Sequence, residues 1–163
     1  MTGWRSNNRN DDGRIKKSLQ SFNDCVLRVF QNITGEVDDR VLARFFPFFD
    51  GGRGVSLDAV IRCLRDAGYR LRPHEEACMT AGVDRGAFYD LCRKIEYPAV
   101  VFYGEPAHAV LVKVGGTVVD SARFEEETVE AYFGGIGELR IRFFGLAVHT
   151  TPKPEEPTPR PES

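Results

Sequence analysis

The chain lacks long apolar runs and lacks a large excess of charge of either sign. Its 163 residues carry a formal net charge of −2, and the sequence pI is about 6.0. No segment approaches the roughly 20 apolar residues that a membrane-spanning helix needs, and the polar amino-terminal residues lack the apolar stretch of a secretory signal. The balanced charge also differs from the basic surface of nucleic-acid-binding domains. We therefore expect a soluble, cytoplasmic protein with no membrane and no nucleic-acid partner.

Metal and nucleotide motifs are also missing. The sequence has four cysteines, and no pair of them shows the short spacing of a zinc ribbon. This spacing disfavours a zinc site built from Cys63, His74, Cys78 and Cys92. The glycine-rich segment 51–54 lacks the lysine and the hydroxyl residue of a phosphate-binding loop. The sequence thus predicts neither a metal ion nor another cofactor, and its cysteines fit a reducing compartment.

What is present is a helical half followed by a β half. Helical periodicity dominates the first part of the chain, and β-branched runs begin at Ala99. The expected helices cover residues 24–34, 37–46, 56–67 and 84–95, with a weaker helix at 73–80, a short one at 125–133 and a last strand at 138–146. Helices followed by an antiparallel sheet define the α+β class.

Composition predicts one domain between two polar ends. Residues 1–18 are expected to form a flexible polar leader, and residues 19–148 have the length and apolar content of a single domain. Residues 149–163 are rich in proline and charge without apolar periodicity, which predicts a disordered tail or linker. Such a tail is a natural attachment point for an assembly partner.

Cys25 is placed at the start of the first predicted helix. Asn23 and Asp24 are good N-cap residues, and Gly35 is a natural stop after the last turn. Cys25 thus falls in the first helical turn, where free backbone N–H groups and the positive end of the helix dipole favour an anion. Because only a thiolate is a strong nucleophile, this position suits a catalytic cysteine. The same N–H groups would favour an oxyanion formed beside the sulfur.

A histidine and an aspartate flank a predicted hairpin further along the chain. One strand covers residues 107–114 and the next covers 117–120, with Gly115-Gly116 between them. His108 opens the first strand, and Asp120 ends the second. A strand gives the imidazole a rigid mount, and a carboxylate on the partner strand would fix its tautomer. The pattern therefore predicts a Cys-His-Asp relay.

The pairing register of this hairpin decides whether the relay forms. If Gly115-Gly116 is an ideal two-residue turn, Arg123 lies opposite His108, and Asp120 is displaced onto the other face of the sheet. In that register Ser121 is the alternative partner of the histidine. A three-residue loop or a bulge would return Asp120 to the face of His108. The sequence leaves both registers open.

Three segments carry a resemblance to a known family. They are residues 23–28 (Asn-Asp-Cys-Val-Leu-Arg), 106–112 (Pro-Ala-His-Ala-Val-Leu-Val) and 118–121 (Val-Val-Asp-Ser). Together they resemble the papain-like cysteine peptidases, in particular small viral leader proteases and small phage-borne proteins. The resemblance implies a papain-like fold, with a helical amino-terminal lobe followed by an antiparallel β-sheet lobe. It also implies a viral or phage-encoded protein of the host cytoplasm or the virion.

The resemblance implies a role for each matching residue. Cys25 would be the nucleophile, His108 the general base and then the general acid, and Asp120 the residue that orients the imidazole. A side-chain amide upstream of the cysteine would stabilise the oxyanion together with the Cys25 backbone N–H. Gln20 is the matching candidate for that amide, and Asn23 is the alternative.

The expected function is cleavage of a peptide or isopeptide bond through a thioester. The substrate would be a protein or peptide, with a ubiquitin-like protein (deubiquitinase activity) or the protein's own polyprotein as narrower forms. The alternative is a papain-like fold that serves as a non-catalytic binding or structural module of a virion. A sheet register that separates Asp120 from His108 would favour this alternative.

Overall fold

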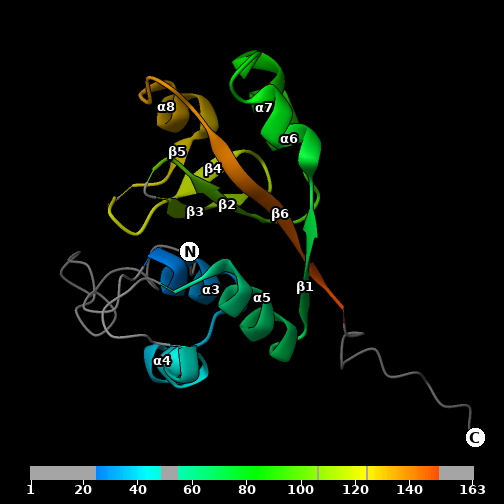
Figure 1. Ribbon diagram of the computed structural model, residues 1–163. Helices are drawn as coiled ribbons and strands as arrows, with labels where there is room; N and C mark the ends of the chain where they lie inside the picture. The colour runs from blue at the N-terminus through cyan, green and yellow to red at the C-terminus, as the bar shows by residue number, and fades with distance from the viewer. Residues whose placement is uncertain (1–24, 49–54, 106, 124, 151–163) are drawn as a thin grey trace, which may run out of the picture.

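The computed structural model describes residues 25–48, 55–105, 107–123 and 125–150. Within these ranges an antiparallel sheet lies between two groups of helices (Figure 1). The sheet therefore has a buried core on each of its faces.

In the described residues the sheet has six strands in the order β1-β6-β2-β3-β4-β5, and each neighbouring pair is antiparallel. The strands are β1 (Tyr69–Pro73), β2 (Ala99–Tyr103), β3 (His108–Lys113), β4 (Thr117–Val119), β5 (Glu127–Thr128) and β6 (Ile141–His149). Successive residues face opposite sides, so Val100 and Leu111 are buried on one face and Val101 and Val110 on the other. This double burial explains the nearly continuous apolar runs of β2 and β3.

One face of the sheet is covered by the first helices of the described chain. They are α3 (Cys25–Thr34), α4 (Asp38–Phe45) and α5 (Leu57–Asp66), and a short 3₁₀ helix, η1 (Phe46–Phe48), follows α4. α3 is enclosed, since every residue from Val26 to Asn32 is buried. Phe30 of α3 meets Phe45 of α4 edge to face, with 5.2 Å between ring centroids. The prediction of a central, packed helix at 24–34 agrees with this arrangement.

Polar side chains also hold α3 in place. Arg28 and Gln31 are each only 1% exposed, and an Arg28 Nη1 atom donates to Gln31 Oε1 at 2.6 Å. Gln31 Nε2 in turn donates to Asp38 Oδ1 at 2.7 Å and to the carbonyl oxygen of Glu36 at 2.9 Å. These hydrogen bonds fasten α3 to the start of α4 and so fix the helix that carries Cys25.

The other face is covered by α6 (Glu75–Thr80), α7 (Arg85–Arg93) and α8 (Val129–Gly134), which lie across the sheet from α3 (Figure 1). Phe88 of α7 is the centre of this core. Its ring lies 5.4 Å from that of Phe133 and 6.1 Å from that of Phe144, measured between centroids. Thr128 is the N-cap of α8, and its side-chain oxygen accepts from the backbone N–H of Ala131 at 3.1 Å.

The predicted order of helices before a sheet, and with it the α+β class, is confirmed in outline. The structure adds β1, which lies between α5 and α6 and pairs with the end of β6. The sequence prediction, with strands only from Ala99 onward, misses this strand. Its alternating apolar and arginine residues, Tyr69 and Leu71 against Arg70 and Arg72, are the signal for it.

The last strand is displaced from its predicted bounds of 138–146. The pairing of β2 with β6 slips by one residue, because Phe102 pairs with Phe143 while Tyr103 pairs with Ile141. Arg142 is therefore the extra residue of a β-bulge, and it is exposed. The bulge changes the direction of the side chains along β6 next to the end of β2 that carries Tyr103.

No helix in the described ranges is long and apolar enough to cross a membrane. The predicted leader, residues 1–18, lies outside the described residues, as does the tail from residue 151 onward. β6 extends to His149, and the Thr150 N–H donates to the carbonyl oxygen of Gly68 at 2.8 Å. Pairing thus continues past residue 148, where the domain was predicted to end.

Candidate active site

Cys25 is the first described residue of α3, and its side chain is half-buried. Gly35, with a φ of 77°, follows the last turn. α3 packs against β3, and this contact brings Cys25 to the side chain of His108, the first residue of that strand. The predicted N-cap residues Asn23 and Asp24 lie outside the described residues.

A three-residue loop connects β3 to β4 and sets the register. Lys113 pairs with Thr117, so residues 114–116 form the loop. Both of its glycines adopt positive φ, 103° and 92°, which is costly for any other residue type. Because a shift of one residue moves every side chain to the opposite face, this register places Asp120 on the same face as His108.

The structure thus has the register of the three-residue loop, which is one of the two that the sequence allows. His108 Nε2 lies 2.9 Å from Asp120 Oδ1. The ideal two-residue turn, with Arg123 opposite the histidine and Ser121 as its partner, is not formed. The aspartate is the partner at that ring nitrogen.

Asp120 is 6% exposed, and hydrogen-bond donors reach both of its oxygens. Oδ1 accepts from the backbone N–H of Ala122 at 3.0 Å as well as facing His108, and Oδ2 accepts from the Tyr132 hydroxyl at 2.6 Å. Burial alone would raise the pKa of Asp120. The hydrogen bonds from His108, Tyr132 and Ala122 outweigh burial and hold that pKa below its ordinary value. Asp120 is therefore a buried carboxylate at neutral pH.

His108 has its pKa raised to about 10. The hydrogen bond to Asp120 is the largest cause, and the hydrogen bond with Cys25 is the second, while burial opposes both. Since Nε2 faces Asp120, the other ring nitrogen, Nδ1, is the one available to the thiol. An imidazole with a thiol as neighbour and a buried carboxylate at Nε2 has the arrangement of an activated nucleophile with an oriented base.

Two tyrosines extend this hydrogen-bonded group, and sequence reasoning missed both. Tyr132 of α8 is 3% exposed, and its hydroxyl lies 2.6 Å from the hydroxyl of Tyr103 at the end of β2. The Tyr103 ring also packs edge to face on His108, with 5.7 Å between centroids. Nothing in the spacing of these tyrosines relates them to Cys25 or to Asp120, so the sequence holds no signal for them.

The two predicted oxyanion residues, Gln20 and Asn23, lie outside the described residues. Of the expected oxyanion donors, only the backbone N–H of Cys25 lies within the described residues.

The other cysteines have different surroundings from Cys25. Cys63 and Cys92 are buried, and burial raises the pKa of their thiols to about 11 and about 12. Burial also raises the pKa of the half-buried Cys78. Among the described residues, no group of three or more His, Cys, Asp or Glu side chains is arranged to hold a metal ion.

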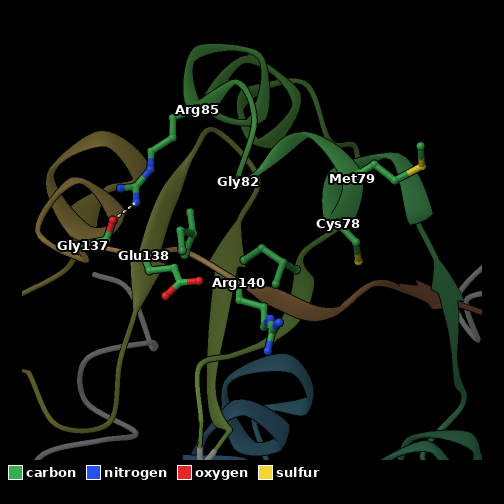
Figure 2. A pocket seen from close by; sticks show the side chains of 9 residues that line it. Cys78, Met79, Gly82, Arg85, Gly137, Glu138 and Arg140 are labelled. Carbon is green, nitrogen blue, oxygen red and sulfur yellow. Dashed lines mark hydrogen bonds between the residues drawn. The ribbon is translucent and has the colours of Figure 1, made fainter.

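A cavity of about 400 Å³ lies between α6, α7 and the start of β6 (Figure 2), and its lining does not include Cys25, His108 or Asp120. Its lining includes Cys78 and Arg85. The Arg85 guanidinium donates to the carbonyl oxygens of Phe133 and Gly137, each at 2.9 Å. That arginine therefore ties α7 to the end of α8, which is a structural role.

Comparison of the chain with protein-family models, with curated proteins and with solved structures found no significant match.

Proposed function

We propose that the protein is a thiol hydrolase of the papain-like kind, which cleaves a peptide or isopeptide bond through a thioester intermediate. The observation that supports this proposal is the contact of Cys25, at the start of α3, with a histidine whose Nε2 is bonded to the buried Asp120. Separate parts of the chain set three features: the place of Cys25 on its helix, the strand register of His108 and Asp120, and the burial of the carboxylate. Their convergence on one imidazole favours catalysis over a non-catalytic binding module.

In the proposed reaction, the Cys25 thiol gives its proton to His108, Sγ bonds to the carbonyl carbon of the substrate, and one electron pair of the carbonyl double bond moves to the oxygen. The Cys25 backbone N–H stabilises that oxygen, with Gln20, or alternatively Asn23, as the proposed side-chain donor. The carbon–nitrogen bond then breaks, and protonated His108 gives its proton to the leaving amine. Water then attacks the thioester carbon while His108 takes its proton, the carbon–sulfur bond breaks to release a carboxylic acid, and the proton on His108 returns to the Cys25 sulfur.

The acyl donor that we propose is a protein or peptide amide. The protein's own polyprotein and an isopeptide of a ubiquitin-like protein are narrower proposals. Both would use the same residues in the same roles, so the mechanism can be tested before the substrate is identified.

The test is alkylation of the native full-length chain with iodoacetamide between pH 5 and pH 9, with the modified cysteine located by mass spectrometry. We expect Cys25 to react at pH 6.5, whereas Cys63 and Cys92 serve as unreactive internal controls because burial raises the pKa of each. In His108→Gln the rate at Cys25 should fall about tenfold or more, toward that of an ordinary thiol.

His149→Gln is the matched control, since it removes an exposed histidine at the end of β6. Its labelling profile should equal that of the wild type. A Cys25 that reacts no faster at pH 6.5 than a free thiol, or equally fast in His108→Gln, would overturn the proposed function and leave the binding module as the better account.

A further inference from the structure

The carboxylate that faces His108 is itself held by a chain of two phenols. Tyr132 donates its hydroxyl proton to Asp120 Oδ2 at 2.6 Å. A hydroxyl has only one proton, so in the 2.6 Å contact between the two hydroxyls Tyr103 must be the donor and Tyr132 the acceptor. The hydrogen bonds therefore run in one direction, from Tyr103 to Tyr132 to Asp120.

This chain ends at the oxygen that His108 does not use. Asp120 Oδ1 faces His108 and Ala122, whereas Oδ2 accepts from Tyr132 alone among the residues that the structure describes. Partners at both oxygens of a carboxylate fix the rotation of its plane. Because Asp120 is 6% exposed, water has little access to replace a missing donor.

The ring of Tyr132 is in turn held by the residues packed around it. Tyr132 is 3% exposed and packs edge to face on Phe133, with 5.0 Å between ring centroids. The guanidinium carbon of Arg123 lies 4.8 Å from the centre of the Tyr132 ring. The Tyr132 hydroxyl is thus placed against Asp120 by a helix, α8, and not by a loop.

We infer that Tyr132 is a positioning residue of the proposed active site: its hydroxyl fixes the Asp120 carboxylate in the rotation that presents Oδ1 to His108, and Tyr103 strengthens this bond. The inference rests on the proposed function. Tyr132 does not touch the reacting atoms; it acts through Asp120. The result is a five-residue group, Cys25, His108, Asp120, Tyr132 and Tyr103, drawn from α3, β3, the residue after β4, α8 and β2.

The test is an NMR titration of the imidazole signals in the full-length chain, between pH 5 and pH 11. The sequence has three histidines, and the signal that is lost in His108→Gln identifies His108. In Tyr132→Phe we expect the His108 midpoint to fall by about one pH unit or more, because its bond to Asp120 is held less well. Tyr103→Phe should lower it by less, since it leaves the Tyr132–Asp120 bond in place.

Tyr89→Phe is the matched control, because Tyr89 packs against the same core without belonging to the hydrogen-bonded chain. The His108 midpoint in Tyr89→Phe should equal that of the wild type. An unchanged or higher midpoint in a folded Tyr132→Phe would overturn the inference, since a merely structural role would not lower it. If Tyr132→Phe does not fold, an unchanged His108 midpoint in Tyr103→Phe would likewise overturn the inference.

Iodoacetamide labelling separates this inference from the proposed function. A wild-type Cys25 that lacks His108-dependent reactivity contradicts the proposed function whatever the titration gives. A reactive wild-type Cys25, together with an unchanged His108 midpoint in Tyr132→Phe, contradicts the positioning role alone.

Discussion

At the scale of single residues, the candidate site depends on opposite pKa changes in two neighbouring groups. The pKa of Asp120 is lowered although burial would raise it, and that of His108 is raised to about 10 although burial would lower it. In both cases hydrogen bonds that favour the charged form outweigh the cost of removing charge from water. An imidazolium and a carboxylate are therefore the stable forms over a wide range of pH.

This pair makes folding stability depend on pH in a defined direction. A raised pKa in the folded state contributes stability that is complete below the unfolded value, 6.5, and is lost as the pH rises through about 10. We therefore expect the difference in unfolding free energy between the wild type and His108→Gln to shrink as the pH rises from 6.5 to 10.5. Urea unfolding at several pH values measures it.

The control for this pH dependence is again His149→Gln, which removes a histidine outside the candidate site. Asp120 has the opposite sign, because its pKa is lowered in the folded state. Its contribution is complete above the ordinary carboxyl range and is lost only in acid. A difference for His108→Gln that grows with pH would contradict the assignment of a raised pKa to this histidine.

At the scale of elements, the β3–β4 loop decides whether a relay exists. Gly115 has open space around its Cα, whereas a Cβ added at Gly116 would lie 2.8 Å from Cγ of Arg93. Gly116 also accepts a hydrogen bond from the Val129 N–H, at 2.9 Å, which ties the loop to the first residue of α8. One loop therefore controls the register of Asp120 and contacts the helix of Tyr132.

Alanine substitutions in this loop should separate the strain of a positive φ from the clash with Arg93. Gly115→Ala adds only the strain of a positive φ, about 1 kcal/mol, while Gly116→Ala adds the same strain and a clash with Arg93. We expect Gly116→Ala to lower the free energy of unfolding more, by about 2 kcal/mol or more. Urea unfolding of both variants tests the order, and equal losses would contradict the close contact with Arg93.

At the scale of the whole molecule, the five residues of the site come from both layers. Cys25 packs with the core of α3, α4 and α5, whereas Tyr132 belongs to the core of α6, α7 and α8. His108, at the start of β3, joins the two groups. The shared sheet is the only described element that contributes residues to both cores, so loss of either core should disturb the site.

This shared sheet predicts one cooperative unfolding transition. Phe30 and Phe88 are fully buried, one in each core. Replacing either with alanine should lower the unfolding free energy by about 3–5 kcal/mol and move the whole transition. Far-ultraviolet and near-ultraviolet circular dichroism should coincide along a urea titration of both variants. Separate transitions in either variant would show that the two cores fold independently.

Local patterns in the sequence determined much of this protein. The helix that carries Cys25, the mixed class and the hairpin with His108 at its opening all follow from short-range periodicity and a glycine pair. Such signals depend only on residues within one or two turns of chain, so they can be recognised without knowing which distant residues pack nearby. The short strand β1 has a local signal too, the alternation of apolar and arginine residues, but its partner β6 lies far along the chain, so the sequence does not show the pairing.

Only the tertiary structure decided the rest. The sequence allowed two registers for the hairpin, and the three-residue loop, packed beside Arg93 and bonded to Val129, corresponds to one of them. The hydroxyls of Tyr103 and Tyr132 meet because β2 and α8 fold against the same face, which no local pattern encodes. The sequence thus determined which side chains could react, whereas long-range packing decided which of them meet, because a hydrogen bond depends on distance in space and not along the chain.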